Sequence, residues 1–302
     1  MKKEKKDAVK AENTQLKAEI KALRERLLSQ QQAIRAKGLP IIVLVEGWAA
    51  AGKGSLINEL ISEIDPRFYN VTTSVITGEA ESRYPFLYPY ACAIPENGKI
   101  MFYDSGWMED VVRKYLHREI TKEQYKERVR SVNEFERQLR HGGYLLLKLF
   151  LDIDAGEQRK RMSALREDYE TAWRVTDEDL WQQREYKLFK QSYESFMDKT
   201  GGLIPWHVLD GNRKNLAVRD AMKLLVEGID RALEAGRYVG KPFKESFPLL
   251  KMPKLAAVDL SPTLTDEEYR AELKKLQKRL GELHNRIYRM KIPVILCYEG
   301  WD

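Results

Sequence analysis

The chain has 302 residues, of which 43% are hydrophobic, so it can bury one large core or two ordinary ones. Its longest apolar runs are far shorter than the ~20 residues that span a bilayer, and its charged first residues lack the apolar core of a signal peptide, so we expect a cytoplasmic protein with no membrane partner. The net charge of +6 favours an anionic partner, but charge alone does not distinguish nucleic acid, a membrane surface or a phosphorylated substrate.

The cysteines and histidines offer no pattern for metal binding. Cys92 and Cys297 are far apart in apolar settings, which argues against a disulfide or a thiolate metal site and predicts that both are buried. The four histidines lack metal-ligand spacing, and we expect them to be structural.

An amphipathic helix is predicted over residues 1–38. Its apolar positions recur at spacings of three, four and seven, at Leu16, Ile20, Leu23, Leu27 and Ile34. A solitary coiled-coil arm is one interpretation. So short a stripe more often packs on its own domain, because coiled coils need more heptads, and we favour that packing.

Strands and helices then alternate over residues 39–240. Runs rich in β-branched and apolar residues predict strands at 39–47, 71–76, 99–104, 144–152 and 206–209. Helical stretches separate them, notably 55–64, 122–139, 177–199 and 216–234. This alternation predicts a doubly wound α/β domain with a five-stranded parallel sheet.

The chain repeats itself after a predicted linker at 241–265, which is rich in proline and lysine. Residues 271–301 match residues 18–48 without a gap, at an offset of 271 − 18 = 253, and both segments contain the pattern PxIxxxEGW. We therefore interpret 266–302 as the helix and first strand of a truncated second copy, and the chain as part of a tandem protein.

The segment GWAAAGKGS, Gly47 to Ser55, has the GxxxxGK spacing of a phosphate-binding loop. It joins a buried strand to a helix, which is the context that the motif requires. Gly52 and Gly54 would let the backbone approach phosphate, the helix N-terminus at Ser55 would favour negative charge, and Lys53 would neutralise it. The usual Ser or Thr directly after the lysine is Gly54 here. The alternative is a chance glycine turn; the loop favours a P-loop kinase-like, three-layer α/β/α fold.

Two further groups of residues fit phosphoryl transfer. Asp104 ends the third strand, where such enzymes keep an acid that holds Mg²⁺, although a helix cap or a salt bridge is the alternative. Basic residues follow the fourth strand, in a helical lid predicted at about 155–200 that would close over phosphates: Arg159, Lys160, Arg161, Arg166 and Arg174. The alternative for each is a solvated helix face. We expect Trp173 and Trp206 in the core.

Several segments together resemble the polyphosphate kinase 2 family, in its two-domain, polyphosphate:AMP phosphotransferase-like form. They are EGWAAAGKGS, DPRFYNV, PFLYPY with IPENGKIMFYDSGW, EQRKRM with TAWRVTDEDL, and PWHVLDGNRKNLAVRD. The resemblance runs from about residue 38 to residue 234 and resumes at Pro293.

The resemblance implies transfer of phosphoryl groups between inorganic polyphosphate and a nucleotide of the AMP or ADP class, with Mg²⁺ as cofactor. It also implies a homo-oligomer or intramolecular pairing with the second copy. The predicted catalytic residues are Lys53, Asp104 (also the metal ligand) and Arg161. The predicted phosphate- or nucleotide-binding residues are Gly47, Gly52, Lys53, Gly54, Ser55, Arg159, Arg166 and Arg174.

Departures from the family pattern indicate that this first copy is degenerate. The family loop reads GxDxAGKG, and its aspartate is Ala49 here; the family's DRSWYNR has two arginines where this chain has Ser105 and Asp110. Losing two cations and gaining the acids Glu109 and Asp110 should disfavour a polyanion. Asp302 stands at the position of the repeat that matches Ala49. The alternatives are an inactive pseudo-kinase or an ATP-dependent nucleoside monophosphate kinase. Nucleic acid is not expected as a partner, because the basic residues interleave with acids.

Overall fold

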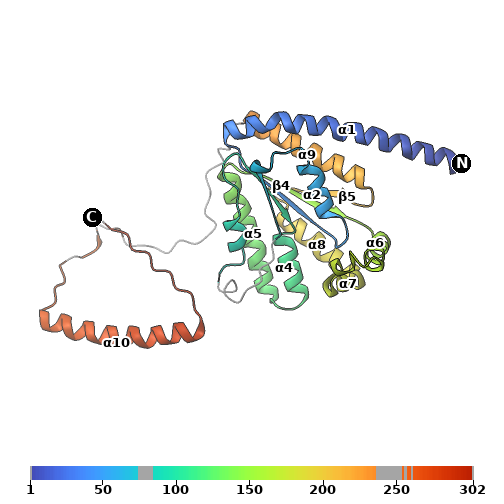
Figure 1. Cartoon of the computed structure of the whole chain (residues 1–302). Helices are drawn as coiled ribbons and strands as arrows, with labels where there is room; N and C mark the ends of the chain where they lie inside the picture. The colour runs from blue at the N-terminus through green and yellow to red at the C-terminus, as the bar shows by residue number, and fades with distance from the viewer. Residues whose placement is uncertain (1, 74–83, 236–253, 255–256, 260, 301–302) are drawn as a thin grey trace. The chain divides into compact units, whose positions relative to one another are not determined.

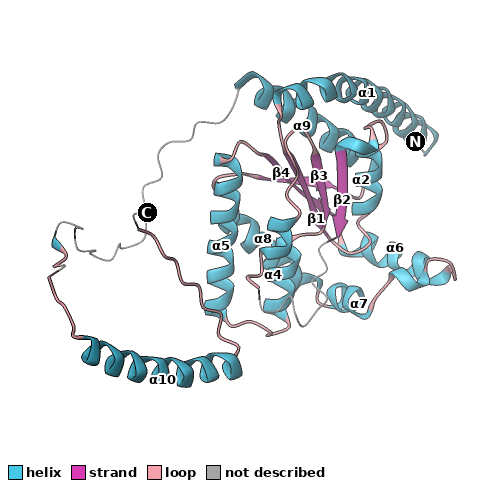
Figure 2. Ribbon diagram, turned by 60° about the vertical axis from the view of Figure 1, so that its left-hand side comes forward, coloured by secondary structure: helices cyan, strands magenta, loops and turns pink. Residues whose placement is uncertain are grey.

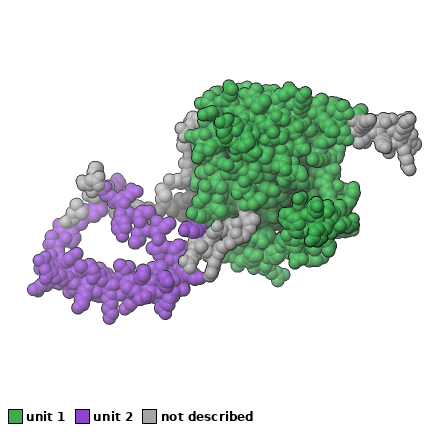
Figure 3. Space-filling view, viewed as in Figure 1, with its two compact units in different colours: residues 1–76, 85–240 green, residues 77–84, 241–302 purple. Residues whose placement is uncertain are grey.

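A computed structural model of the chain, shown in Figure 1, describes residues 2–73, 84–235, 254, 257–259 and 261–300. The chain divides into two compact units, residues 1–76 with 85–240 and residues 77–84 with 241–302 (Figure 3). Most of the predicted linker at 241–265 lies outside the described residues, as do Trp301 and Asp302.

The core of unit 1 is a five-stranded sheet in which every neighbouring pair of strands is parallel (Figure 2). The strand order is β2-β3-β1-β4-β5, which confirms the predicted doubly wound sheet. The bounds are Ile41–Gly47 (β1), Tyr69–Thr73 (β2), Ile100–Asp104 (β3), Leu145–Asp152 (β4) and Trp206–Asp210 (β5). The predicted second strand continued to residue 76, and its last residues lie outside those described.

Helices cover both faces of the sheet and make the three-layer α/β/α arrangement. On one face α2 contacts β1 and β3, α9 contacts β4 and β5, and α1 packs along α9 (Figure 1). On the other face α4 contacts β1, α5 contacts β4, and α8 packs against α4 and α5. These helices span Lys2–Lys37 (α1), Lys53–Ile61 (α2), Trp107–Leu116 (α4), Lys122–His141 (α5), Tyr186–Thr200 (α8) and Lys214–Ala235 (α9). The shorter ones are Tyr88–Cys92 (α3), Ala155–Glu167 (α6) and Asp177–Arg184 (α7).

Lys148 interrupts the apolar run of β4 and is fully buried. Its Nζ donates to Glu136 Oε2 at 2.7 Å and to the carbonyl oxygen of Thr200 at 2.7 Å. Glu136 Oε1 in turn accepts from Trp107 Nε1 at 3.1 Å. A buried charge is tolerated only when it is paired and hydrogen-bonded, and this network meets that requirement.

Three predictions from the sequence are wrong in detail. The single helix predicted at 177–199 is two helices, because Glu185 leaves helical geometry (φ −97°, ψ 28°) and thereby lets Tyr186 lie flat against Trp48. Cys92 and Cys297 are exposed, since their apolar neighbours in sequence do not share a covered face. Trp173 is 74% exposed because it lies on a short 3₁₀ turn, Ala172–Arg174, away from the core.

In unit 2, helix α10 spans Asp266–Met290 and begins with a capping box formed by Thr265 and Glu268. Residues 292–300 form neither a strand nor a helix, so the strand expected there is not formed in this structure. None of the helices that the structure describes, in either unit, has the length and apolar character needed to cross a bilayer.

Candidate functional site

The predicted phosphate loop lies between β1 and α2, at the carboxyl edge of the sheet. Gly47 has φ 142°, and a Cβ there would lie 2.4 Å from the carbonyl oxygen of Leu151 in β4, so no other residue fits. Gly52 has φ 97° and precedes the first turn of α2, which begins at Lys53. The amides of Lys53 and the residues that follow therefore lie at a helix N-terminus, the usual site for a bound phosphate.

Residue 49 of the loop is held from behind by two buried glutamines. The Ala49 amide donates to Gln182 Oε1 of α7 at 2.9 Å, and Gln158 Nε2 of α6 donates to the Ala49 carbonyl oxygen at 3.3 Å. Gln158 Nε2 also donates to Gln182 Oε1 at 2.8 Å, and Gln182 Nε2 to Tyr193 Oη at 2.9 Å. The amide of Ala49 is thus already satisfied by the protein.

Trp48 fixes the loop to helix α8. Its ring stacks on Tyr186, with centroids 4.0 Å apart and planes at 11°, and its Nε1 donates to Asp152 Oδ1 at 2.7 Å. Trp48 is almost completely buried, so the loop and α8 share one packed contact.

Lys53 points back toward its own loop. Its Nζ donates to the carbonyl oxygens of Gly47 at 3.2 Å and Trp48 at 3.4 Å. It lines a small cavity of about 30 Å³, whose charged members are otherwise Glu109, Arg113, Glu178 and Asp179. Three carboxylates therefore face two cations on this side of the loop.

Glu46 lies beneath the loop, fully buried at the end of β1. Its Oε1 accepts from the amides of Gly106 at 3.0 Å and Met108 at 2.9 Å, at the N-terminus of α4. Its Oε2 has no hydrogen-bond partner among the described residues. Burial, followed by the charge of Glu109, raises the pKa of Glu46 to about 8, so its protonated form is favoured near neutrality.

A larger cleft of about 770 Å³ opens on the other side of the loop. It brings together six of the predicted residues: Gly52, Gly54, Ser55, Asp104, Arg161 and Arg174. Its remaining wall is partly apolar, with Leu56, Leu151 and Leu165. A cleft with apolar walls and a few convergent charges is typical of a small-molecule site.

Asp104 reaches the loop from the end of β3. Its Oδ2 would lie 3.4 Å from a Cβ built on Gly54. Burial raises the pKa of this carboxyl, while the charge of Lys53 opposes the rise. Asp104 is therefore placed where an acid could meet both the loop and a ligand bound to it.

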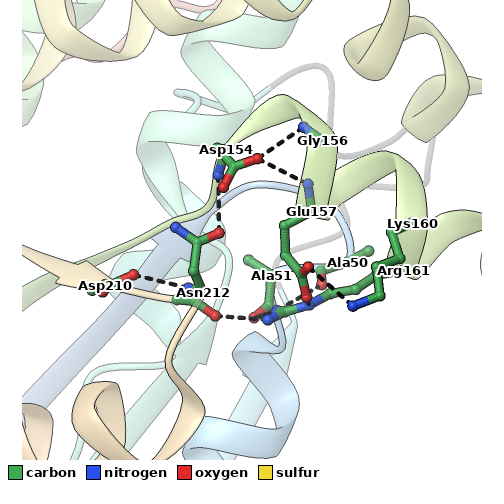
Figure 4. Close-up of polar contacts among 10 residues, drawn as sticks. Ala50, Ala51, Asp154, Gly156, Glu157, Lys160, Arg161, Asp210 and Asn212 are labelled. Carbon is green, nitrogen blue, oxygen red and sulfur yellow. Dashed lines mark hydrogen bonds and ion pairs between the residues drawn. The ribbon is translucent and has the colours of Figure 1, made fainter. Parts of the chain in front are cut away.

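Arg161 of α6 lies over the loop, as Figure 4 shows. Its guanidinium donates to the carbonyl oxygens of Ala51 at 3.0 Å and Gly211 at 2.8 Å, and its Nε donates to Glu157 Oε1 at 2.7 Å. Helix α6 begins at an Asp154 cap that accepts from the amides of Gly156 and Glu157 (Figure 4). Arg161 thus links the loop to the segment after β5 while still lining the cleft.

The other predicted lid residues differ in whether they line the cleft. Arg174 lines the cleft beside Asp168, and its Cζ lies 5.5 Å from the centre of the Trp173 ring. Arg159 and Arg166 are exposed and line neither the cleft nor the small cavity. Gly47 and Lys53 belong to the loop but not to the cleft wall.

The two changed positions after β3 differ in their consequences. Asp110 is mostly buried and pairs with Lys114 at 2.7 Å and Arg128 at 3.5 Å, so its charge is neutralised within the scaffold. Ser105 has φ 65° and ends the strand. Glu109 is the acid that faces the loop, and one of its carboxylate oxygens has no hydrogen-bond partner among the described residues.

Sequence reasoning missed Glu46, Gln182 and Lys214 as parts of the site. Glu46 carried a signal, because the repeat contains it twice, as Glu46 and Glu299. Gln182 carried none, since it meets Ala49 only through the fold. Lys214 lines the cleft at the start of α9, and its Nζ is 3.4 Å from Glu59.

Comparisons with known proteins agree with the fold. A family model described as polyphosphate kinase 2 (PPK2) matches residues 10–236. A polyphosphate:AMP phosphotransferase of Pseudomonas syringae pv. tomato is 28% identical over 298 residues, which cover 94% of this chain and 58% of the relative. An ADP-polyphosphate phosphotransferase of Pseudomonas aeruginosa is 28% identical over 200 residues, which cover 66% of each chain.

A solved structure supports the fold. The crystal structure of polyphosphate kinase 2 from Arthrobacter aurescens TC1 is similar with a TM-score of 0.70 and 24% identity, covering 78% of this chain and 84% of that one. The chain spans only about three fifths of the Pseudomonas syringae relative.

Proposed function

Because this chain belongs to the polyphosphate kinase 2 family, we propose that it is part of a phosphotransferase that moves phosphoryl groups between inorganic polyphosphate and a nucleotide of the AMP or ADP class. The observation that carries the proposal is the cleft of about 770 Å³, which joins the N-terminus of α2 to Asp104, Arg161 and Arg174. Relatives named for such transfers, to AMP and to ADP, support it.

The residues of the cleft suit phosphate binding. The amides at the start of α2 would donate to phosphate oxygens, and Arg161 and Arg174 would offset the remaining charge. Phosphoryl transfer depends mainly on positioning and charge stabilisation, which these groups supply.

Asp104 and Ser55 are the residues of this cleft that would hold Mg²⁺. No described group of three or more His, Cys, Asp or Glu could bind a metal alone, so phosphate oxygens and water would complete the shell. That arrangement fits Mg²⁺, which protein sites usually bind through one or two carboxylates together with substrate phosphates. When bound, the ion would offset charge on the transferring phosphate.

We further propose that this copy binds phosphate but transfers it poorly. Ala49 has no group to coordinate metal, and its amide is occupied by Gln182. The small cavity beside Lys53 contains Glu109, Glu178 and Asp179, whose charges disfavour a polyanion there.

The main transfer activity would then belong to a second copy in a tandem protein, to which this unit is joined or paired, in the cytoplasm. The repeat of residues 18–48 at 271–301 and the greater length of the relatives support this. A homo-oligomer is the alternative assembly.

Calorimetry with tripolyphosphate, followed by turnover assays with polyphosphate, AMP or ADP and Mg²⁺, tests both proposals. We expect binding that Lys53→Ala, which removes the cation of the loop, weakens, with little turnover; Lys160→Ala, which removes an exposed cation outside the loop, the cleft and the small cavity, is the control. Robust turnover that Lys53→Ala abolishes would refute the proposal that this copy is degenerate and would support the proposed phosphotransferase activity. If tripolyphosphate does not bind and no turnover is detected, a structural module is the remaining interpretation.

A further inference from the structure

Helix α1 shows how an amphipathic helix is held on this fold. Leu16, Ile20, Leu27 and Ile34 are buried, and α1 packs along α9 (Figure 1). Gln30 Nε2 adds a bond to the carbonyl oxygen of Val226 at 3.0 Å. The interface is therefore an apolar stripe with polar contacts.

Two ion pairs border this stripe. Glu19 Oε2 lies 3.1 Å from Arg219 Nη1, and Arg26 Nη2 lies 2.6 Å from Asp230 Oδ2. On α9 the two partners are 230 − 219 = 11 residues apart, which is three helical turns. Arg219 also contacts Asp220 at 2.7 Å. The two pairs favour one register of α1 along the apolar stripe.

Helix α10 carries the same stripe. At the offset of 253 residues, Ile20, Leu23, Leu27 and Ile34 correspond to Leu273, Leu276, Leu280 and Ile287. In unit 2 none of the described residues of α10 is buried, and Leu276 and Leu280 are 61% and 65% exposed. A row of exposed leucines of this length marks an interaction surface.

The bordering charges are also repeated. Glu272 stands at the position of Glu19, and Arg279 at that of Arg26. Within α10, Arg279 contacts Glu282 at 3.1 Å and Glu272 contacts Lys275 at 3.5 Å, both at the exposed surface, where such contacts contribute little. Both charges are therefore placed to pair with a helix like α9.

Pairing of α10 with a second copy of itself is disfavoured. The stripe has heptad spacing, but the positions beside it carry Arg270, Arg279 and Arg286 against the single acid Glu272. Two such helices would place like charges beside each other, whereas coiled-coil partners place opposite charges there.

The segment after α10 further limits the kind of partner that can cover unit 2. Val294, Ile295 and Leu296 are 55%, 88% and 72% exposed, and they correspond to Ile41, Ile42 and Val43, which are fully buried in β1 between β3 and β4. A single helix cannot cover both α10 and this strand-like run. The partner must supply a sheet as well.

We propose that α10 and residues 292–298 dock on a second α/β unit of this fold in the same polypeptide. Its helix equivalent to α9 presents a basic residue to Glu272 and, three turns later, an acidic residue to Arg279. The inference rests on the tandem arrangement proposed above, and it adds the docking face, the partner element and the charges that set the register.

A helix transplant in the full chain tests the docking face of α10. The transplant places the α10 sequence in the position of α1, where it must pack on α9. Residues 12–37 are replaced by residues 265–290, which keeps the offset of 253. We expect unit 1 to fold, with its thermal midpoint lowered by roughly 4–8 °C, because the transplant replaces the buried Leu16 by Tyr269, Gln30 by Leu283, and Arg24, the partner of Glu59, by Gln277. Adding Leu283→Gln should recover part of that loss.

Matched variants distinguish packing through the apolar stripe from the mere formation of a helix. Leu273→Asp with Leu280→Asp in the transplant should lower the midpoint by more than about 10 °C, or unfold unit 1. In the transplant, Arg279 takes the position of Arg26 opposite Asp230. Asp230→Arg should therefore lower the thermal midpoint, and adding Arg279→Glu should restore part of the loss.

Three outcomes would overturn the proposal: a transplant as unstable as its Asp-substituted control, no recovery in the double charge reversal, or self-association of the unmodified chain that Leu280→Asp abolishes. The last result, measured by analytical ultracentrifugation, would assign the face to a second α10. None of these measurements depends on phosphate binding, so loss of the proposed activity would leave them interpretable.

Discussion

The two sides of the loop differ in charge. On the cleft side, Asp104 meets Arg161, Arg174 and the start of α2 around about 770 Å³. On the lid side, Lys53 and Arg113 share about 30 Å³ with Glu109, Glu178 and Asp179.

The comparison teaches that a loop motif does not by itself guarantee a catalytic site. The glycines still give the backbone its shape, but the chemistry depends on charges supplied by α4, α6 and α7. On the proposed function, the charges of the cleft side suit a phosphate chain, whereas the carboxylates of the other side disfavour one.

Glu46 lies buried directly before the loop, between the two sides. Of the changes predicted below, its titration should have the largest effect, and that effect is on the free energy of unfolding. With a pKa of about 8 when folded and 4.5 when unfolded, Glu46 keeps its proton in the folded state and loses it in the unfolded state between these values. Its contribution to the free energy of unfolding should therefore fall as pH rises from about 5 to 8, by roughly 2–4 kcal/mol. Urea unfolding of wild type and Glu46→Gln across this range measures it; a difference between the two that is constant with pH would contradict it.

Arg161→Ala tests the cleft side. The variant removes a guanidinium that lines the cleft and bonds the Ala51 and Gly211 carbonyl oxygens, so we expect tripolyphosphate affinity to fall by about tenfold or more. Calorimetry measures the affinity, and Arg159→Ala, outside the cleft, should leave it unchanged. Equal losses in both variants would mean that only overall charge matters.

Glu109→Gln tests the lid side with a smaller effect of opposite sign. Removing this charge beside Lys53 should raise tripolyphosphate affinity about two- to fivefold, and less at high salt. Glu119→Gln, at an exposed position after α4, is the control. If affinity falls, Glu109 supports the site instead of opposing it.

Ala49→Asp should have the smallest effect. The new carboxyl would meet a loop whose amide is held by Gln182 and a cavity that is already acidic, so turnover should change by no more than about twofold. A steady-state assay with polyphosphate and ADP measures it. A gain above tenfold would identify Ala49 as the single cause of degeneracy.

The sequence predicted the sheet and the loop because both follow from local pattern. Apolar runs identified all five strands, and the GxxxxGK spacing located the turn into α2. The pairing of Ala49 with Gln182, 133 residues away, and the neutralisation of Asp110 by Arg128 could not be read in this way. Such contacts depend on where the helices pack. The sequence therefore flagged Glu109 and Asp110 alike, and the fold shows that Glu109 faces the loop while Asp110 is paired within the scaffold.

The stack of Trp48 on Tyr186 has a spectroscopic consequence. The Trp48 indole packs between the loop and α8, with its N–H on Asp152, so its contribution to the emission of the six tryptophans depends on both elements. Any ligand that shifts the loop relative to α8 changes the surroundings of this fluorophore. The protein therefore contains its own optical probe where the loop meets α8.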